Sequence, residues 1–349
     1  MLSASELRAA YEVLRQREPH LYLRDAAERL GVSEMHLLRL DAGGQVIRLR
    51  PDIPALLEAL PTLGPLKALS RNQWVVIETI GTYPAPYTER GAAIFNSPTI
   101  DLRIYLSVWR HAFAVRSFAK DGRPLYSLQF FSPWGEALHK VYLTAAEQVA
   151  RWEALVAQYR HDDQTPEAEP LTPPSQPTER IPLPPGKTED FLREWDNLTD
   201  THEFFGLLRR FGIDRLSAVK VAEGRHTWRL APSTIHDLLE WARESQTPIM
   251  FFVGNAGIHH IYTGTVRMVS PARGWLNVLD PDFNLHIDPA GICEVYLVRK
   301  PTQEGDIYSV EAFGPKGEEV LWIFGARKPG QAVPEAWRRY VESLRVGVA

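Results

Sequence analysis

Residues 161–187 read HDDQTPEAEPLTPPSQPTERIPLPPGK. This segment contains eight prolines and almost no large apolar side chain. Because proline has a fixed φ and no backbone N–H, such a segment forms neither a helix nor a central strand. We therefore interpret it as an extended linker. It divides the 349-residue chain into an N-terminal half, residues 1–160, and a C-terminal half, residues 188–349.

The two halves resemble each other in sequence. Four segments of the first half match four of the second at offsets between 181 and 183 residues. Each match is weak alone, but a shared spacing across four segments indicates an internal duplication. The pairs are IRLRPDIPALL (47–57) with WRLAPSTIHDLL (228–239), RNQWVVIETIGTY (71–83) with GNAGIHHIYTGTV (254–266), PTIDLR (98–103) with PDFNLH (281–286), and SLQFFSPWGE (127–136) with SVEAFGPKGE (309–318).

Each half opens with a helical pattern and continues with short strand-like runs rich in β-branched and aromatic residues. Blocks of strands with helices at their ends predict an α+β fold of two tandem repeats, each an antiparallel sheet flanked by helices. A further helix is predicted over 144–159, starting at Thr144. The opening helices are 5–16 and 189–198, and the expected strands are 74–80, 104–109, 125–131, 137–143, 249–254, 258–264, 274–280, 294–300 and 320–326.

The composition excludes several classes of protein. The chain has 39 basic and 43 acidic residues, so no excess positive charge holds it to nucleic acid. Cys293 is the one cysteine, which rules out an intrachain disulfide and a CxxC metal site, and we expect it to be a small core residue. The N-terminus has no signal-peptide pattern and no run of 18 apolar residues exists, so we expect a cytoplasmic protein without membrane insertion.

Residues 25–38, DAAERLGVSEMHLL, have the pattern of a helix-turn-helix with Ser33 as an N-cap. The pattern allows either DNA binding or a simple two-helix corner. The second helix offers Glu34, Met35 and His36, which provide few groups that read bases or bind phosphates. The duplicate segment 204–216 keeps the shape without the signature, so we favour the two-helix corner and expect no nucleic-acid partner.

The chain contains no GxSxG, HExxH, P-loop or GxGxxG motif. His259 and His260 are adjacent on an expected strand, where neighbouring side chains point to opposite faces. We therefore expect one buried and one exposed histidine rather than a shared metal site.

His202 lies among aromatic residues in WDNLTDTHEFFGLLRRFG (195–212). Thr199 or Asp200 could cap a new helix that ends at Gly212, or the preceding helix could continue through this stretch. In both arrangements His202 lies near an apolar face. It could be a satisfied, partly buried histidine or the axial ligand of a haem, which needs a neutral imidazole.

The combination of motifs resembles the bacterial HemS/ChuS/PhuS/HmuS family of cytoplasmic haem-degrading and haem-trafficking proteins. The resemblance covers nearly the whole chain. In the second half it rests on DNLTDTHEFFGLLRRFGIDRLSA (196–218), FFVGNAGIHHIYTGTV (251–266), FNLHI (283–287) and IFGARKPG (323–330), and in the first on YLRDAAERLGVSE (22–34), LSRNQWVVIETIGTY (69–83) and SPTIDLRIYLSVW (97–109).

The resemblance implies haem (iron protoporphyrin IX) in a cleft of the C-terminal half. It implies His202 as the axial iron ligand and Arg103 as a distal residue. Phe252 matches a pocket aromatic residue, and Lys300 and Arg327 match basic residues near the porphyrin edge and propionates. Phe324, with Trp322, stands where some relatives are expected to have polar contacts, so stacking is expected there instead.

The resemblance also implies a role in iron acquisition with two alternatives. One is an enzyme that opens the porphyrin oxidatively and releases iron with an external reductant. The other is a carrier that takes haem from an importer and delivers it to a separate haem oxygenase. The duplication places His286 opposite Arg103, and His20, beside Pro19, opposite His202, so we expect one haem site per chain.

A first prediction concerns Arg103, for which pairing with an acid such as Asp101 is the structural alternative. If Arg103 holds a water or hydroxide on the iron, Arg103→Ala changes the sixth-ligand signal in the absorbance spectrum and any haem turnover more than it changes haem affinity. Unaltered turnover would reduce Arg103 to a positioning residue.

Overall fold

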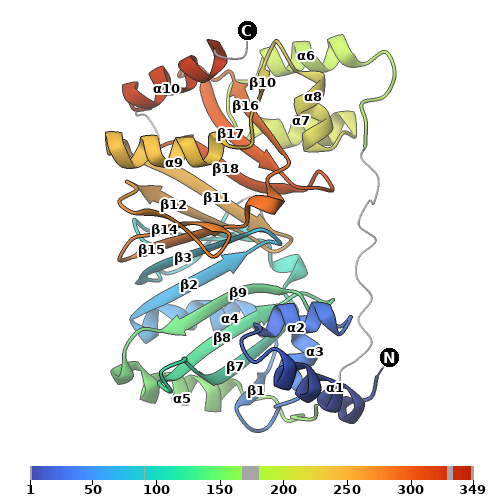
Figure 1. The fold of residues 1–349 in the computed structure, drawn as a ribbon, viewed down its shortest axis with the longest axis vertical. Helices are drawn as coiled ribbons and strands as arrows, with labels where there is room; N and C mark the ends of the chain where they lie inside the picture. Colours follow the sequence, from blue (N-terminus) through green and yellow to red (C-terminus); the bar gives the residue numbers. More distant parts are fainter. Residues whose placement is uncertain (1, 90, 167–180, 328–332, 347–349) are drawn as a thin grey trace. The chain divides into compact units, whose positions relative to one another are not determined.

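The computed structural model describes residues 2–89, 91–166, 181–327 and 333–346 (Figure 1). The chain forms two compact units. Unit 1 comprises Met1–Ser70, Glu78–Ser175 and Asn255–His259, and unit 2 comprises Arg71–Ile77, Gln176–Gly254 and His260–Ala349. Each unit is therefore built mainly from one half of the sequence. The boundaries at 160 and 188 stay a prediction, and linker residues 167–180 lie outside the described residues.

In unit 1, neighbouring strands pair antiparallel in the orders β1-β7-β8-β9-β2 and β6-β5-β4. Its elements are α1 (Ala4–Arg17), α2 (Leu23–Arg29), α3 (Glu34–Arg39), β1 (Val46–Leu49), α4 (Ile53–Ala59), η1 (Leu60–Leu63), β2 (Pro65–Arg71), β4 (Tyr87–Glu89), β5 (Ala92–Asn96), β6 (Asp101–Ile104), η2 (Leu106–Val108), β7 (His111–Phe118), β8 (Pro124–Phe131), β9 (Ala137–Leu143), η3 (Ala146–Gln148) and α5 (Val149–Tyr159). The chain changes units within β3 (Val75–Thr82) and β12 (Ile258–Gly264), and also at the last residues of β2 and of β11 (Ile249–Asn255).

In unit 2, the corresponding antiparallel orders are β10-β16-β17-β18-β11 and β15-β14-β13. Its elements are α6 (Thr188–Asp196), α7 (Glu203–Phe211), α8 (Arg215–Val221), β10 (Thr227–Leu230), α9 (Thr234–Ser245), β11 (Ile249–Asn255), β13 (Val269–Ala272), β14 (Trp275–Leu279), β15 (Phe283–Ile287), η4 (Pro289–Gly291), β16 (Glu294–Lys300), β17 (Ile307–Phe313), β18 (Glu319–Gly325) and α10 (Glu335–Val346).

The strand registers confirm the predicted duplication and the α+β class. Ile94 pairs with Arg103 in unit 1, and Asn277 pairs with His286 in unit 2, as the offset of 183 requires. Both units also carry a register shift at the matching place, between Phe130 and Phe131 in β8 and between Ala312 and Phe313 in β17. A shared irregularity is stronger evidence of common ancestry than shared strands, because bulges are specific local features.

The sheet of unit 2 buries both faces. Successive residues of β16 alternate between faces. Tyr296 and Val298 pack with α6, α7 and α8, whereas Val295 and Leu297 pack with α9 and α10. Figure 1 shows these two groups of helices on opposite sides of the strands. The face toward α7 therefore has its polar and aromatic residues fixed between a sheet and a helical layer.

Several predicted elements are confirmed, and two are wrong in part. The runs 137–143, 258–264 and 294–300 are β9, β12 and β16. The predicted strand 104–109 ends at Ile104, because the Tyr105 N–H and the Trp109 indole N–H both donate to the Gly257 carbonyl and turn the chain. This is a tertiary contact that local propensity does not contain.

The predicted helix over 144–159 begins only at Val149, after a 3-10 turn. The backbone N–H groups of Thr144 and Ala145 donate to the side-chain oxygen of Gln148, which is buried. Gln148 therefore satisfies the donors at this helix start, and Thr144 is not the cap.

Cys293 is exposed, so its expected place in the core is wrong. It lies in the short connection between η4 and β16, outside the alternating strand pattern. The corner at 25–38 forms α2 and α3, with Ser33 accepting from the His36 N–H as expected.

His260 is fully buried, as expected for one of the two histidines. His259 is half-buried rather than exposed, and its Nδ1 lies 2.9 Å from Tyr105 Oη, so the expectation of an exposed partner is wrong. Among the described residues, no helix combines the length and apolarity needed to cross a membrane.

Candidate functional site

His202 stands at the start of α7, which is a separate helix. Helix α6 ends at Asp196, so the alternative of a continuous helix through this stretch is wrong. His202 itself occupies the N-cap position, and neither Thr199 nor Asp200 does. Gly212 ends the helix with φ of 60°, a conformation that glycine adopts without strain, as predicted.

The His202 side chain is 67% exposed, more than a partly buried core histidine would be. Its Nδ1 lies 2.6 Å from Asp200 Oδ1, and its backbone N–H donates to the same oxygen at 2.7 Å. Nε2 makes no hydrogen bond within the part of the chain that the structure describes. This arrangement leaves one imidazole nitrogen open to an incoming ligand.

Four aromatic side chains contact one another in series from α7 to β18 and β11, and we call them the aromatic surface: Phe205, Phe252, Trp322 and Phe324. Ring centroids are 6.2 Å apart for Phe205–Trp322, 6.1 Å for Phe252–Trp322 and 5.1 Å for Phe252–Phe324. Phe205 follows His202 by three residues, which places the two on the same side of α7. Phe205 is 45% exposed. The aromatic surface is thus continuous from the exposed start of α7 into the sheet.

Gly206 has no side chain, so the backbone of α7 is uncovered four residues after His202. A Cβ built there would meet only the Arg210 guanidinium, at 3.5 Å. Glycine inside a helix costs about 1 kcal/mol relative to alanine. A bare backbone four residues after His202 leaves room for a flat ligand to approach α7.

A buried cluster of charges lies under the aromatic surface. Glu311 accepts two hydrogen bonds from Arg215, at 2.7 and 2.9 Å, one from Lys300 at 2.8 Å and one from Ser309 at 2.7 Å. Arg215 lies 4.0 Å from the Trp322 ring centroid, and Lys300 lies 5.7 Å from that of Phe324. The cluster therefore supports the aromatic rings from below through cation–π contacts.

The charges in this cluster set each other's pKa values. Burial lowers the pKa of Lys300 to about 8, although Glu311 opposes the shift. Burial would raise the pKa of Glu311, but Arg215 and Lys300 outweigh it and hold that pKa well below its ordinary value. Glu311 consequently stays ionised across the physiological range.

The structure brings some of the predicted site residues together. Phe324 contacts both Phe252 and Lys300 at the aromatic surface of unit 2. Lys300 is only 3% exposed and is bonded to Glu311, so its predicted place at a porphyrin edge stays a prediction. Arg327 is 25% exposed and donates to Glu304 at 3.3 Å.

Arg103 belongs to unit 1, where it donates to the Asp101 carboxylate. This is the pairing that the sequence offered as the structural alternative. Its expected distal role stays a prediction.

Sequence reasoning missed Arg215 and Glu311, which lie 96 residues apart and have no local signal. The spacing of three residues places Phe205 on the same apolar face as His202 in the sequence, but Phe205 was not predicted as a site residue.

The matching positions of unit 1 carry different chemistry. By register, Gln129 and Lys140 occupy the places of Glu311 and Trp322. Glu34 begins α3 as Arg215 begins α8, and Glu34 pairs with Lys140. An ion pair therefore replaces the aromatic ring and its supporting cation, and the aromatic surface belongs to unit 2.

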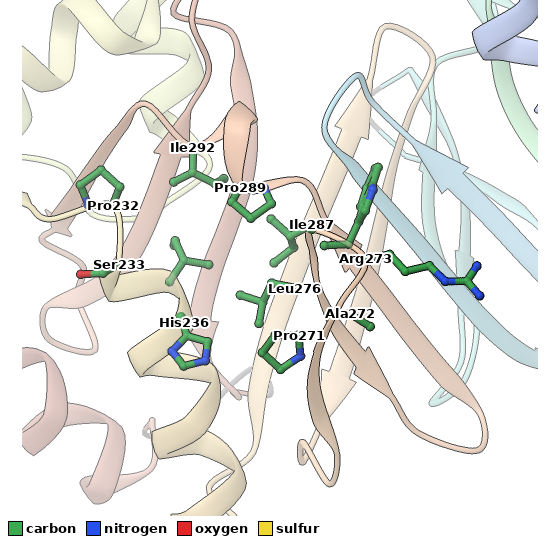
Figure 2. A pocket seen from close by; sticks show the side chains of 13 residues that line it. Pro232, Ser233, His236, Pro271, Ala272, Arg273, Leu276, Ile287, Pro289 and Ile292 are labelled. Atoms are coloured by element: carbon green, nitrogen blue, oxygen red, sulfur yellow. The ribbon is translucent and has the colours of Figure 1, made fainter. Parts of the chain in front are cut away.

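Unit 2 also contains a cavity of ≈480 Å³ away from these residues. Its lining is mostly apolar and comes from the start of α9, the β13–β14 hairpin and the segment from Ile287 to Ile292. Figure 2 shows the Arg273 guanidinium pointing away from the cavity. None of the predicted site residues lines it.

The fold is thus a repeated α+β unit, and the candidate site of unit 2 is an exposed histidine with an aromatic surface. The chain belongs to the family of the haemin-degrading HemS.ChuX domain, whose profile matches it twice, at residues 31–159 and 212–344. The chain is 35% identical to the hemin transport protein HmuS of Yersinia pestis over 335 residues, 96% of each protein. It is 35% identical to the hemin transport protein HemS of Yersinia enterocolitica over 93% of each protein.

Solved structures agree with this assignment. Holo-PhuS, a heme-binding protein from Pseudomonas aeruginosa, is 40% identical with a TM-score of 0.89, over 98% of this chain and 99% of that one. The heme-degrading enzyme ChuS of Escherichia coli O157:H7 is 30% identical with a TM-score of 0.88, over the same shares of the two chains. Another ChuS structure is described as a heme oxygenase. The resemblance found in the sequence is confirmed.

A second prediction tests the buried cluster. Glu311→Gln removes the hydrogen-bonded counter-charge of Arg215 and Lys300 and leaves only the partly exposed Glu319, 3.9 Å from Arg215, which costs about 3 kcal/mol of unfolding free energy. Glu304→Gln, which removes the more exposed partner of Arg327, is the control and costs about 1 kcal/mol or less. Urea unfolding followed by tryptophan fluorescence measures both. Equal losses for the two variants would contradict a supporting role of the cluster.

Proposed function

We propose that unit 2 binds haem, with His202 Nε2 as the axial ligand of the iron. The observation that carries this proposal is the open Nε2 of an exposed histidine, held beside a continuous aromatic surface. A haem protein needs only one histidine on the iron and apolar walls for the porphyrin. The haem-bound state of PhuS and the hemin transport proteins among the relatives support the same ligand class.

The donor set fits haem better than a free metal ion. In the described part of the chain, no group of three or more His, Cys, Asp or Glu side chains could hold a metal. A single imidazole binds a free ion weakly, whereas the porphyrin supplies four ligands of its own. Phe205, Phe252, Trp322 and Phe324 offer the stacking surface that the macrocycle needs.

Among the predicted basic residues, Arg327 suits a haem propionate best. Arg327 follows Phe324 by three residues in sequence. Its guanidinium is partly exposed, so replacing Glu304 by another carboxylate costs little free energy. Lys300 would have to leave Glu311 inside the buried cluster, which costs far more. We therefore assign Lys300 to the support of the aromatic surface and Arg327 to a propionate.

We propose one haem per chain. The position of Trp322 is taken by Lys140 in unit 1, where a charged pair replaces the stacking surface. His20 matches His202 only in sequence offset. Of the two rings that β18 contributes, unit 1 keeps only one, because Tyr142 matches Phe324 while Lys140 takes the place of Trp322.

Haem handling then takes one of two forms in this family. We propose oxidative opening of the porphyrin with release of iron, for which the bound iron supplies the oxygen chemistry and an outside donor supplies the electrons. The chain's own contribution is to hold the iron from one side through His202 and to shield the macrocycle with aromatic rings. The relative described as a heme oxygenase supports this form.

The exposure of His202 favours a second form, a carrier that takes haem from an importer and delivers it to a separate oxygenase. A ligand that is 67% exposed can be approached by a partner protein without unfolding of the site. The hemin transport proteins among the relatives support this form.

A third prediction tests haem ligation. Haemin titration of the apo-protein, followed by absorbance, gives a saturable one-to-one Soret shift. His202→Ala weakens binding about tenfold or more, equivalent to about 1.4 kcal/mol, and changes the ferric spectrum. His236→Ala removes another exposed histidine of unit 2 and leaves the titration unchanged.

An unchanged spectrum and titration in His202→Ala would reject His202 as the ligand. Absence of a specific shift in the wild-type protein would reject haem binding itself.

A fourth prediction separates enzyme from carrier. When reductant and oxygen are added to the haem-loaded protein, an enzyme loses its Soret band to an open-chain product and releases iron to a chelator. Catalase and superoxide dismutase are included to remove adventitious peroxide chemistry. A Soret band that persists, together with haem transfer to an added oxygenase, would contradict the enzyme and support the carrier.

A further inference from the structure

We infer that Asp200 is a positioning residue that fixes His202 as its Nδ1–H tautomer and strengthens Nε2 as a ligand for iron. This inference rests on the proposed function, because it concerns how the proposed ligand is prepared.

The geometry carries the first step. One oxygen, Asp200 Oδ1, accepts from the His202 backbone N–H at 2.7 Å and lies 2.6 Å from Nδ1 of its ring. Two contacts from one atom fix the backbone and the ring orientation together. A carboxylate accepts but does not donate, so Nδ1 carries the hydrogen and a neutral ring keeps its lone pair on Nε2.

The loop around Asp200 is held in the same way. The Glu203 carboxylate accepts from the Thr199 N–H at 2.8 Å, the Thr199 hydroxyl at 3.0 Å and the Asp200 N–H at 3.3 Å. The Thr199 carbonyl in turn accepts from the Gln303 N–H at 3.0 Å, which joins the loop to the turn after β16. The carboxylate that orients His202 is therefore placed before any ligand arrives.

The chemical consequence follows from the charge of Asp200. An anion that accepts from Nδ1–H draws the proton toward itself and leaves more electron density on Nε2. Ligating histidines are commonly oriented by a carboxylate in this way, and loss of such a partner costs about 10–100-fold in affinity or activity. Because Asp200 is 52% exposed, water competes for this hydrogen bond, and we expect the lower part of that range.

The first test needs no haem. Long-range ¹H–¹⁵N NMR of the apo-protein at about pH 8.5, two units above the ordinary histidine pKa, reports the tautomer of His202. We expect Nδ1–H in the wild-type protein and a shift toward Nε2–H in Asp200→Ala. Asp190→Asn removes a different exposed acid of the same unit and leaves the tautomer unchanged.

The second test uses the haem-loaded protein. Asp200→Asn keeps an acceptor for the His202 backbone N–H, so the loop stays folded, but it removes the charge. Resonance Raman spectra of the ferrous form should show the iron–histidine stretch at lower frequency in this variant, with haem affinity reduced about tenfold. Asp200→Glu, which restores the charge, should recover part of both.

The outcomes separate the two claims. A wild-type Nε2–H tautomer, or the same tautomer and iron–histidine frequency in Asp200→Ala and Asp200→Asn, would overturn the inference while haem binding stands. If the tautomer depends on Asp200 but haemin gives no specific Soret shift with the wild-type protein, the proposed function is overturned, and the ligand role of Nε2 is lost with it.

Discussion

The hydrogen-bonded cluster of Arg215, Lys300 and Glu311 is the constraint on which the second unit depends. It joins the start of α8 to β16 and β17 in the buried layer between helices and sheet. Three buried charges are tolerated there because Glu311 accepts from both cations and from Ser309. The two cations then lie under aromatic rings, which they hold in place. A surface of rings with fixed spacing is what a rigid, flat ligand requires.

The duplicated fold explains how such a site arises in one unit. Both units keep the same strand pairing and the same bulge in the second strand of their long hairpins. The framework tolerates opposite charge at one helix start, with Glu34 in α3 and Arg215 in α8. In unit 1, Glu34 at the helix start pairs with Lys140. In unit 2, Arg215 begins the matching helix, and the Trp322 ring takes the place of Lys140. The framework is thus shared, while the ligand chemistry differs between the units.

The fold could be predicted largely from local patterns. Strands such as 137–143 and 294–300 are rich in β-branched and aromatic residues and are bounded by turn-forming residues, as expected for a sheet. The repeated spacing indicates the duplication. The errors came from longer-range contacts. The predicted strand ends at Ile104 because the Trp109 indole N–H donates to the carbonyl of Gly257, which is 148 residues away in sequence. At the predicted helix 144–159, Gln148 provides the capping oxygen that Thr144 was expected to provide. The intrinsic helix and strand propensities of the residues predict neither of these two contacts.

The site could be predicted only in part. His202, Phe252 and Phe324 were identified through a family resemblance, and the sequence alone left the role of His202 open. The exposure of His202 and its contact with Asp200 required coordinates, since a two-residue spacing permits many loop geometries. Arg215 and Glu311 are single charged residues far apart in sequence, and only the fold shows that they pair.

The most direct measurement of the central claim is a crystal structure of the haem-loaded protein. We predict that iron is bonded to His202 Nε2, that the porphyrin lies against Phe205, Phe252, Trp322 and Phe324, and that Asp200 is still bonded to Nδ1. Haem bound elsewhere, at the apolar cavity beside α9 or on unit 1, with His202 unligated, would contradict it.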